Sequence, residues 1–285
     1  MISVIIPTLD RGEKDYSIVW LMNSLSDQSV PPDEVLVCID NDGENTAAFL
    51  RTYRKFNRKF VIRMFRRTAP KAIEGGGPGL AEQILFANVK GDIIIHVDSD
   101  GYLNRKMIEF VVSQKINEPP YKCLWGRNIF YDECTGFPLE QEDGRLADYP
   151  SIPGIYPMNR LDAHGALWAV PTKIIRDIGG HAIVGIDWRG QDSRLGQRIQ
   201  SFCQCCFVTL HPFCFNHFGI PTQHRLLHPQ GISKYDRFLE AQEIKKFKQT
   251  HHLPQLGWFD MLIANGGENF WSSGALDSMY VEIKD

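Results

Sequence analysis

The sequence lacks long apolar runs, a strong bias toward one charge and a regular pattern of cysteines. Its 285 residues are 43% hydrophobic and 23% charged, with a formal net charge of -3, a composition typical of globular proteins. No run approaches the ~20 apolar residues that a membrane-spanning helix needs. The balanced charge argues against nucleic-acid binding, which requires a basic surface. Seven cysteines, an odd number, do not indicate a disulfide framework.

Two common nucleotide-binding signatures are also missing. No Gly-x-Gly-x-x-Gly turn follows the first strand, and no Gly-Lys-Ser/Thr completes the glycine-rich segment at 75–79. The first absence argues against a Rossmann dehydrogenase, and the second against a Walker-A loop. The chain enters an apolar strand at once, without a basic or apolar leader, so we expect a cytoplasmic protein.

The pattern that is present is an alternation of apolar strands with amphipathic helices. It predicts an α/β fold with a mostly parallel, Rossmann-type sheet flanked by helices. We expect strands at 3–8, 34–39, 61–65, 93–97, 122–131, 161–170, 202–210 and 213–217. The helices are expected at 17–28, 47–56, 80–89, 105–117, 172–178, 189–200 and 234–250. Segment 132–159 has no helical period, and we expect it to be a loop that covers the site.

The most informative stretch is the apolar run Ile93–Val97 with the polar residues that follow it. Ligands of parallel sheets bind beyond the carboxyl ends of strands, where Asp98 and Asp100 lie. Because side chains alternate along a strand, these two carboxylates point the same way and can bind one hard cation. Two carboxylates need water and substrate phosphates to complete a Mg²⁺ or Mn²⁺ site. The alternative is an ordinary polar turn, since Asp, Ser and Gly are turn residues.

Four blocks in this order resemble the nucleotide-binding half of a family 2 glycosyltransferase with the GT-A fold. The blocks are Ser-Val-Ile-Ile-Pro-Thr at 3–8, Glu-Val-Leu-Val-Cys-Ile-Asp at 34–40, the glycine-rich loop and helix ending in Lys-Gly-Asp at 90–92, and Asp-Ser-Asp at 98–100. The resemblance covers residues 1–110 well and continues more loosely to 191–198. There the family has Glu-Asp followed by Arg, whereas this chain has Gln191, Asp192 and Arg198.

The resemblance implies a nucleotide-sugar donor and assigns residues to it. The donor-binding residues it implies are Pro7, Thr8, Asp10, Asp40, Gly77, Asp98, Ser99 and Asp100. Asp40 corresponds to the family's acid that reads the nucleotide base, and a carboxylate can accept a hydrogen bond from a uracil or guanine N–H. Asp40 is equally a residue type that caps turns such as Asp-Asn-Asp-Gly. Thr8 and Asp10 are equally compatible with plain loop residues. Gly77 lies before a helix N-terminus, whose free N–H groups suit phosphate or ribose.

The resemblance also implies the catalytic, metal-binding and acceptor-binding residues. Asp192 corresponds to the general base of an inverting transfer, although Asp is also a common helix N-cap. For a third metal ligand beside Asp98 and Asp100 we choose His217, with His211 and His224 as alternatives. Trp188 and Gln191 are the candidates for binding the acceptor.

We therefore expect one GT-A-like domain over 1–285, with a nucleotide-sugar half at 1–100, an acceptor half at 101–233 and a C-terminal helix and tail at 234–285. The expected reaction moves a sugar, with inversion, from a nucleotide donor (a UDP-sugar is favoured) to a hydroxyl of a glycan, glycolipid or glycoprotein, using Mn²⁺ or Mg²⁺. Two alternatives stay open, a nucleotidyltransferase acting on sugar phosphates and a non-catalytic nucleotide-sugar or glycan-binding protein. The aromatic residues Trp258, Phe259, Phe270 and Trp271 are compatible with peripheral membrane contact or with domain packing.

Overall fold

The computed structural model describes residues 1–8, 17–39, 44–68, 78–131, 153–158, 166–181, 191–218, 277 and 280–284. At 17, 78, 130–131, 191–194 and 217–218 it describes the backbone only. Its strands are β1 (Ile2–Thr8), β2 (Glu34–Ile39), β3 (Val61–Arg67), β4 (Ile93–Val97), β5 (Gly101–Leu103), β6 (Lys122–Tyr131), β7 (Ile155–Pro157), β8 (Leu167–Pro171), β9 (Gln204–Val208), β10 (Cys214–Phe218) and β11 (Tyr280–Glu282). Its helices are α1 (Ser17–Ser26), α2 (Asn45–Phe56), α3 (Pro78–Asn88), α4 (Met107–Ser113), α5 (Thr172–Ile178), α6 (Gln191–Gln200) and a short 3₁₀ helix, His211–Phe213.

The strands form one sheet whose first half is parallel, as the sequence predicts. The order along the sheet is β11-β3-β2-β1-β4-β8-β6-β10-β5, and β9 pairs with β6 and β7. Strands β1 to β4 run parallel, whereas β8 is antiparallel to both β4 and β6. The predicted α/β class with helices flanking the sheet is confirmed, and the second half of the sheet is mixed.

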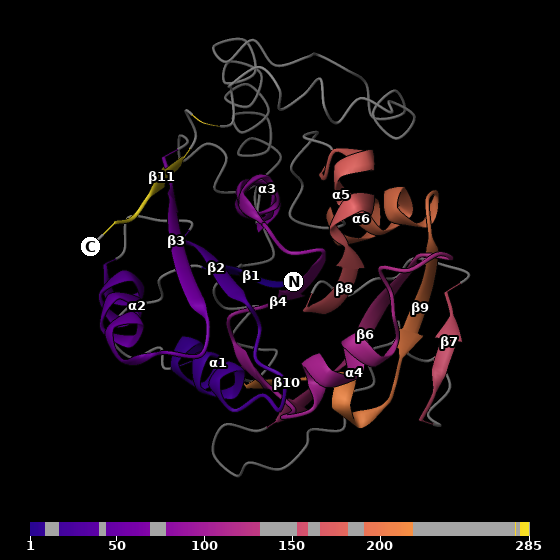
Figure 1. Ribbon diagram of the computed structural model, residues 1–285, viewed down its shortest axis with the longest axis horizontal. Helices are drawn as coiled ribbons and strands as arrows, with labels where there is room; N and C mark the ends of the chain where they lie inside the picture. The colour runs from indigo at the N-terminus through magenta and orange to yellow at the C-terminus, as the bar shows by residue number, and fades with distance from the viewer. Residues whose placement is uncertain are drawn as a thin grey trace, which may run out of the picture.

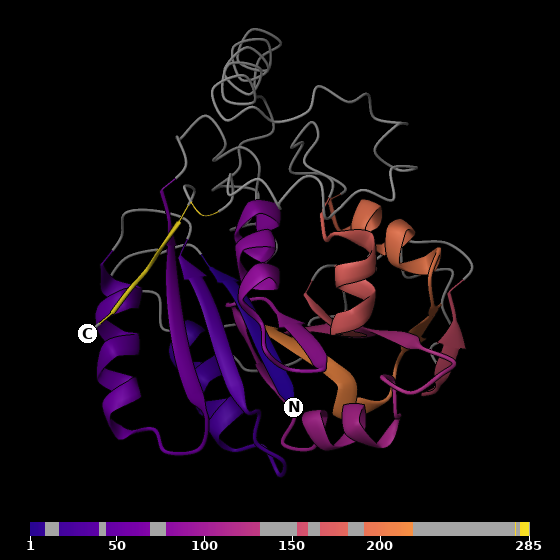
Figure 2. The same ribbon diagram turned by 45° about the horizontal axis from the view of Figure 1, so that its top comes forward.

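Helices cover both faces of the sheet (Figures 1 and 2), and an apolar layer fills the space on each face. Alternate residues of β4 divide between them, since Ile93, Ile95 and Val97 pack with α1, α2 and α4 while Ile94 packs with α3, α5 and α6. A strand covered on both faces has to be apolar throughout, which explains the continuous apolar runs in the sequence. His96 is the exception in β4, and its side chain is fully buried.

Some predicted boundaries differ from the structure for local reasons. The helix predicted at 105–117 ends at Ser113, because Lys115 adopts a positive φ of 50°, which ends a helix. Part of the segment predicted as a loop at 132–159 forms β7, which pairs with β9. The tail predicted to be irregular contains β11, which pairs with β3. The predicted helix at 234–250 lies outside the described residues.

The described helices include none that is long and apolar enough to cross a membrane.

Candidate active site

The two acids of the Asp-Ser-Asp segment lie immediately after β4, at the carboxyl end of the parallel half of the sheet. The Asp98 backbone N–H donates to the Ala166 carbonyl at 2.9 Å, which fixes the chain as it leaves the strand. The Asp98 side chain is 37% exposed, whereas Asp100 and Ser99 are buried. The Asp98 carboxylate is therefore accessible from solvent, whereas the Asp100 carboxylate is buried.

The chain after Asp100 pairs at once with a strand from much later in the sequence. β5 is antiparallel to β10, and Gly101 stands directly opposite His217 in this ladder. A side chain at Gly101 has no room, because a Cβ there would lie 2.4 Å from the Asn216 carbonyl oxygen and 2.4 Å from the Phe215 ring. Glycine is thus required for the close approach that brings the His217 backbone to the residue next to Asp100.

The alternative metal ligands lie elsewhere. His211 is exposed, and its Nδ1 lies 3.1 Å from Asn104 Nδ2, beyond the opposite end of β5 from Asp100. His224 is outside the described residues. Among the described side chains, no three or more His, Cys, Asp or Glu residues are grouped so that they could hold a metal ion.

The ends of β1 and β2 lie at the same edge of the sheet as Asp98. Thr8 is buried and pairs with Ile39, the residue before Asp40. Pro7 is buried as well, and the β1–β4 ladder runs to Ile5 and His96, two residues before Pro7 and Asp98. Of the other predicted donor-binding residues, Asp10, Asp40 and Gly77 lie outside the described residues, as does Trp188 on the acceptor side.

Helix α6 begins at this edge too. Strands β4, β6 and β9 run in one direction, because β8 is antiparallel to β4 and β6, and β9 is parallel to β6. α6 leads into β9 through a short turn, so the helix starts where these strands end (Figure 2). Gln191 and Asp192 are its first two residues. Arg198, further along, is buried and donates to the Ile178 carbonyl at the end of α5.

A buried charged cluster that the sequence reading missed lies behind Asp98. Glu82 of α3 is 1% exposed and contacts two imidazoles, with its Oε1 3.0 Å from His96 Nε2 and its Oε2 hydrogen-bonded to His181 Nε2. His96 Nε2 also lies 4.0 Å from Asp98 Oδ1. The sequence contains one sign of this cluster, which is that charged or polar residues interrupt apolar segments. A Glu interrupts Leu-Ala-Glu-Gln-Ile-Leu-Phe, and a His interrupts Ile-Ile-Ile-His-Val.

The pKa of Glu82 shows how the cluster is charged. Burial alone raises the pKa of this carboxyl group, but the nearby His181 and His96 outweigh the burial and lower the pKa from 4.5 to about 2. The carboxylate is therefore ionised at neutral pH, although it is buried.

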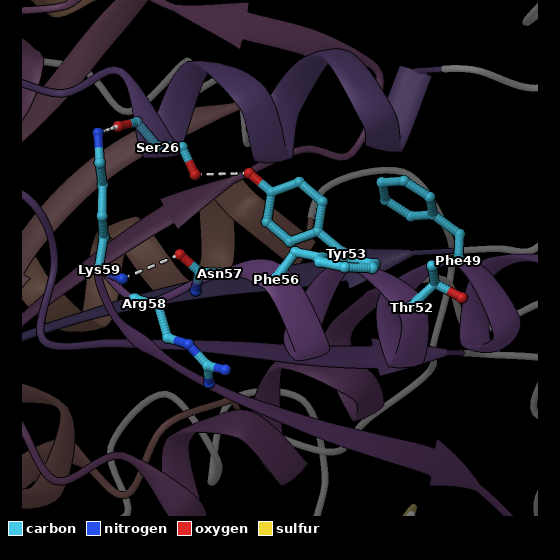
Figure 3. Close-up of a pocket in the computed structure, with 8 residues that line it drawn as sticks. All are labelled: Ser26, Phe49, Thr52, Tyr53, Phe56, Asn57, Arg58 and Lys59. Atoms are coloured by element: carbon cyan, nitrogen blue, oxygen red, sulfur yellow. Dashed lines mark hydrogen bonds between the residues drawn. The ribbon is translucent and has the colours of Figure 1, made fainter.

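A separate groove of about 480 Å³ lies between α1 and α2, away from these residues (Figure 3). The hydroxyl groups of Tyr53 and Ser26 form a hydrogen bond of 2.5 Å across the groove, and the Phe56 side chain beside it is 80% exposed. Both helices run back from the carboxyl edge of the sheet, so the groove lies at the opposite edge from Asp98. Its lining comprises Ser26, Phe49, Thr52, Tyr53, Phe56, Asn57, Arg58 and Lys59.

Sequence comparison identifies one family and one group of relatives. Residues 3–179 match glycosyl transferase family 2. Poly(ribitol-phosphate) beta-N-acetylglucosaminyltransferase TarS of Staphylococcus aureus (strain Mu50) is 28% identical over 107 residues, which are 38% of this chain and 17% of TarS. The chain thus matches only a minor part of the length of that relative.

Several solved structures with a similar fold were determined with a nucleotide sugar, or with a nucleotide and a sugar. The S. aureus TarS fragment 1-349 in complex with UDP-GlcNAc has a TM-score of 0.59 at 16% identity, covering 96% of this chain and 74% of that one. The mannosyltransferase PcManGT of Pyrobaculum calidifontis, with GDP-Man and Mn²⁺, has a TM-score of 0.53 at 14% identity, covering 97% and 73%. GalNAc-T7 with UDP, GalNAc and Mn²⁺ has a TM-score of 0.54 at 18% identity, covering 95% and 57%.

At these identities the structural likeness establishes the GT-A fold. The family match is independent of it and spans well over half of the chain. The strand–helix alternation, the acids after β4 and both comparisons agree: this chain belongs to glycosyltransferase family 2.

Proposed function

We propose that this protein transfers a sugar from a nucleoside-diphosphate sugar, with a UDP-sugar favoured, to a hydroxyl group of a glycan or glycoconjugate. The observation that carries the proposal is the position of Asp98 and Asp100. They follow the central parallel strand of a family 2 fold, at the edge where β1 and β2 also end. This edge is where α/β sheets bind nucleotides. TarS was solved with UDP-GlcNAc and PcManGT with GDP-Man, which supports a nucleotide-sugar donor.

A divalent cation, Mn²⁺ or Mg²⁺, fits the residues at this edge. Two carboxylates, one of them partly exposed, are oxygen ligands of the kind that hard cations prefer. The pairing of His217 with Gly101 supports His217 as the third protein ligand. Bound there, the cation would act as a Lewis acid that stabilises the negative charge of the departing diphosphate. PcManGT and GalNAc-T7 were both solved with Mn²⁺.

We assign the proton transfer to Asp192. The acceptor oxygen attacks the anomeric carbon while the bond from that carbon to the diphosphate breaks, so the configuration at the carbon inverts. The hydroxyl proton passes to the Asp192 carboxylate. The chain direction that starts α6 at the carboxyl edge supports this role. Trp188 and Gln191 precede Asp192 closely in the sequence, and we assign them to acceptor binding.

The assignment is tested by variants assayed for release of nucleoside diphosphate with a panel of donors and glycan acceptors. Asp98→Ala and Asp100→Ala should abolish transfer while the fold is retained, and Asp192→Asn should bind donor but not transfer. Asp92→Ala is the matched control, because Asp92 is an exposed acid at the other end of β4, 2.8 Å from the N-terminal amine. Full turnover in both Asp98→Ala and Asp100→Ala would refute the metal site. A normal rate in Asp192→Asn would refute the base.

A further inference from the structure

The Glu82 cluster joins three parts of the chain, namely α3, β4 and the turn after α5. Glu82 lies in the first half of α3, which follows the glycine-rich segment at 75–79. His96 lies in β4, two residues before Asp98. His181 follows the Gly179–Gly180 turn at the end of α5. A single carboxylate therefore contacts side chains from the donor-binding and the acceptor-binding halves of the fold.

Two contacts of different kinds orient the His96 ring, one with an aromatic ring and one with a carboxylate. Trp168, its partner across the β4–β8 ladder, stacks on it with the ring centroids 4.9 Å apart and the planes 3° apart. This contact sets the plane of the imidazole but is compatible with a half-turn about the Cβ–Cγ bond, which exchanges the positions of Nε2 and Cε1. Glu82 Oε1 lies 3.0 Å from Nε2, and this contact favours the ring orientation in which Nε2 rather than Cε1 faces the carboxylate. Loss of the Glu82 carboxylate would remove this preference for one of the two orientations.

The same nitrogen of His96 faces Asp98. Nε2 is 4.0 Å from Asp98 Oδ1, which is within ion-pair range and longer than a hydrogen bond. His96 and Asp98 are two residues apart, and side chains at this spacing in an extended chain point to the same side. A flip of the imidazole therefore changes which ring atom faces the Asp98 carboxylate. His96 Nε2 thus lies between the Glu82 and Asp98 carboxylates.

The second imidazole is held in the same way. Phe86 stacks on His181 with centroids 5.6 Å apart and planes 17° apart, and the His181 backbone N–H donates to Gln83 Oε1 at 2.8 Å. Gly180 has a φ of 73°, and a Cβ there would lie 2.2 Å from Gln83 Oε1. The turn is therefore packed tightly against α3, and Glu82 lies at the centre of this contact.

We propose that Glu82 is a positioning residue, which acts through His96 to orient the Asp98 carboxylate for binding a divalent cation. The inference rests on the proposed function, because it takes Asp98 as a metal ligand. It goes beyond that function by assigning a role to a residue that touches neither donor nor acceptor. Residues that orient metal ligands from behind typically change metal affinity 10–100-fold when they are replaced.

The test measures Mn²⁺ binding in the presence of UDP or GDP, by the loss of the electron paramagnetic resonance signal of free Mn²⁺, below the unfolding temperature of every variant. Glu82→Gln keeps the size of the side chain but offers one acceptor oxygen instead of two. It should bind Mn²⁺ at least about tenfold more weakly. The matched control is Glu34→Gln, a buried carboxylate that accepts from Ser3 Oγ at 2.5 Å at the opposite edge of the sheet. It should bind Mn²⁺ within about twofold of the wild type.

A double-mutant cycle separates positioning from general loosening of the fold. If Glu82 acts through His96, then Glu82→Gln should have little further effect in a His96→Gln background. Additive losses, an unchanged affinity in Glu82→Gln, or an equal loss in Glu34→Gln would each overturn the proposal. If Glu82→Gln does not fold, the Mn²⁺ affinity of His96→Gln tests the proposal instead. An affinity within twofold of the wild type in that variant would overturn the proposal. A wild-type protein that binds no Mn²⁺ with either nucleotide would instead refute the proposed metal site itself.

Discussion

Acid should destabilise this protein through Glu82. In the folded state the pKa of Glu82 is about 2, below its usual value of 4.5, because His181 and His96 outweigh the effect of burial. A group whose pKa is lowered by folding stabilises the protein at any pH above its unfolded pKa. That contribution is lost as the pH falls from about 5 toward 2. The difference between the two pKa values corresponds to roughly 3 kcal/mol in the free energy of unfolding.

Urea unfolding followed by tryptophan fluorescence, at several pH values between 7 and 2.5, measures this loss. The wild type should lose stability on acidification by roughly 2–3 kcal/mol more than Glu82→Gln, so that the two curves converge at low pH. Parallel curves for the wild type and Glu82→Gln would show that the carboxylate is not held ionised by the two imidazoles.

Two further variants test the packing around the site. Gly101→Ala should destabilise the fold by roughly 1–3 kcal/mol and weaken Mn²⁺ binding, because the added Cβ forces β5 away from β10. An unchanged thermal stability would contradict the close packing of β5 against β10. Trp168→Ala should lower the free energy of unfolding, measured by chemical denaturation, by roughly 3–5 kcal/mol, because the ring is fully buried against His96, Phe86 and Trp125. A loss below about 1 kcal/mol would show that these ring contacts are not maintained.

The first half of the fold was predictable because its signals are local. The run Ile93–Val97 and the run Glu34–Ile39 match β4 and β2 residue for residue, since a strand buried on both faces is mostly apolar. The three-residue strands β5, β7 and β11 were not predicted. Each exists only through pairing with a distant partner, as Tyr280 pairs with Arg67, and so few residues carry no period of their own.

The site was predictable in part for the same reason. Asp98 and Asp100 stand at the end of a recognisable strand, so their edge of the sheet followed from the sequence. The proximity of His217 to Gly101 depends on a ladder between segments more than a hundred residues apart. The contacts of Glu82 depend on three separate elements meeting in the core, and a single sequence shows only that a charged residue interrupts an apolar helix.

The most direct test of the proposed function is the thermal stability of the protein with UDP-, GDP-, dTDP- and CMP-sugars, each with Mn²⁺ and with EDTA. A ligand at about a hundredfold excess over its Kd stabilises the folded state by ~2.7 kcal/mol. For a chain of this size, that corresponds to a rise of about 5 °C or more in Tm. We expect one nucleotide class, UDP first, to raise Tm with Mn²⁺ and not with EDTA, and Asp98→Ala to abolish the rise. No metal-dependent rise with any of the four classes, in a folded sample, would contradict the assignment as a metal-dependent nucleotide-sugar transferase.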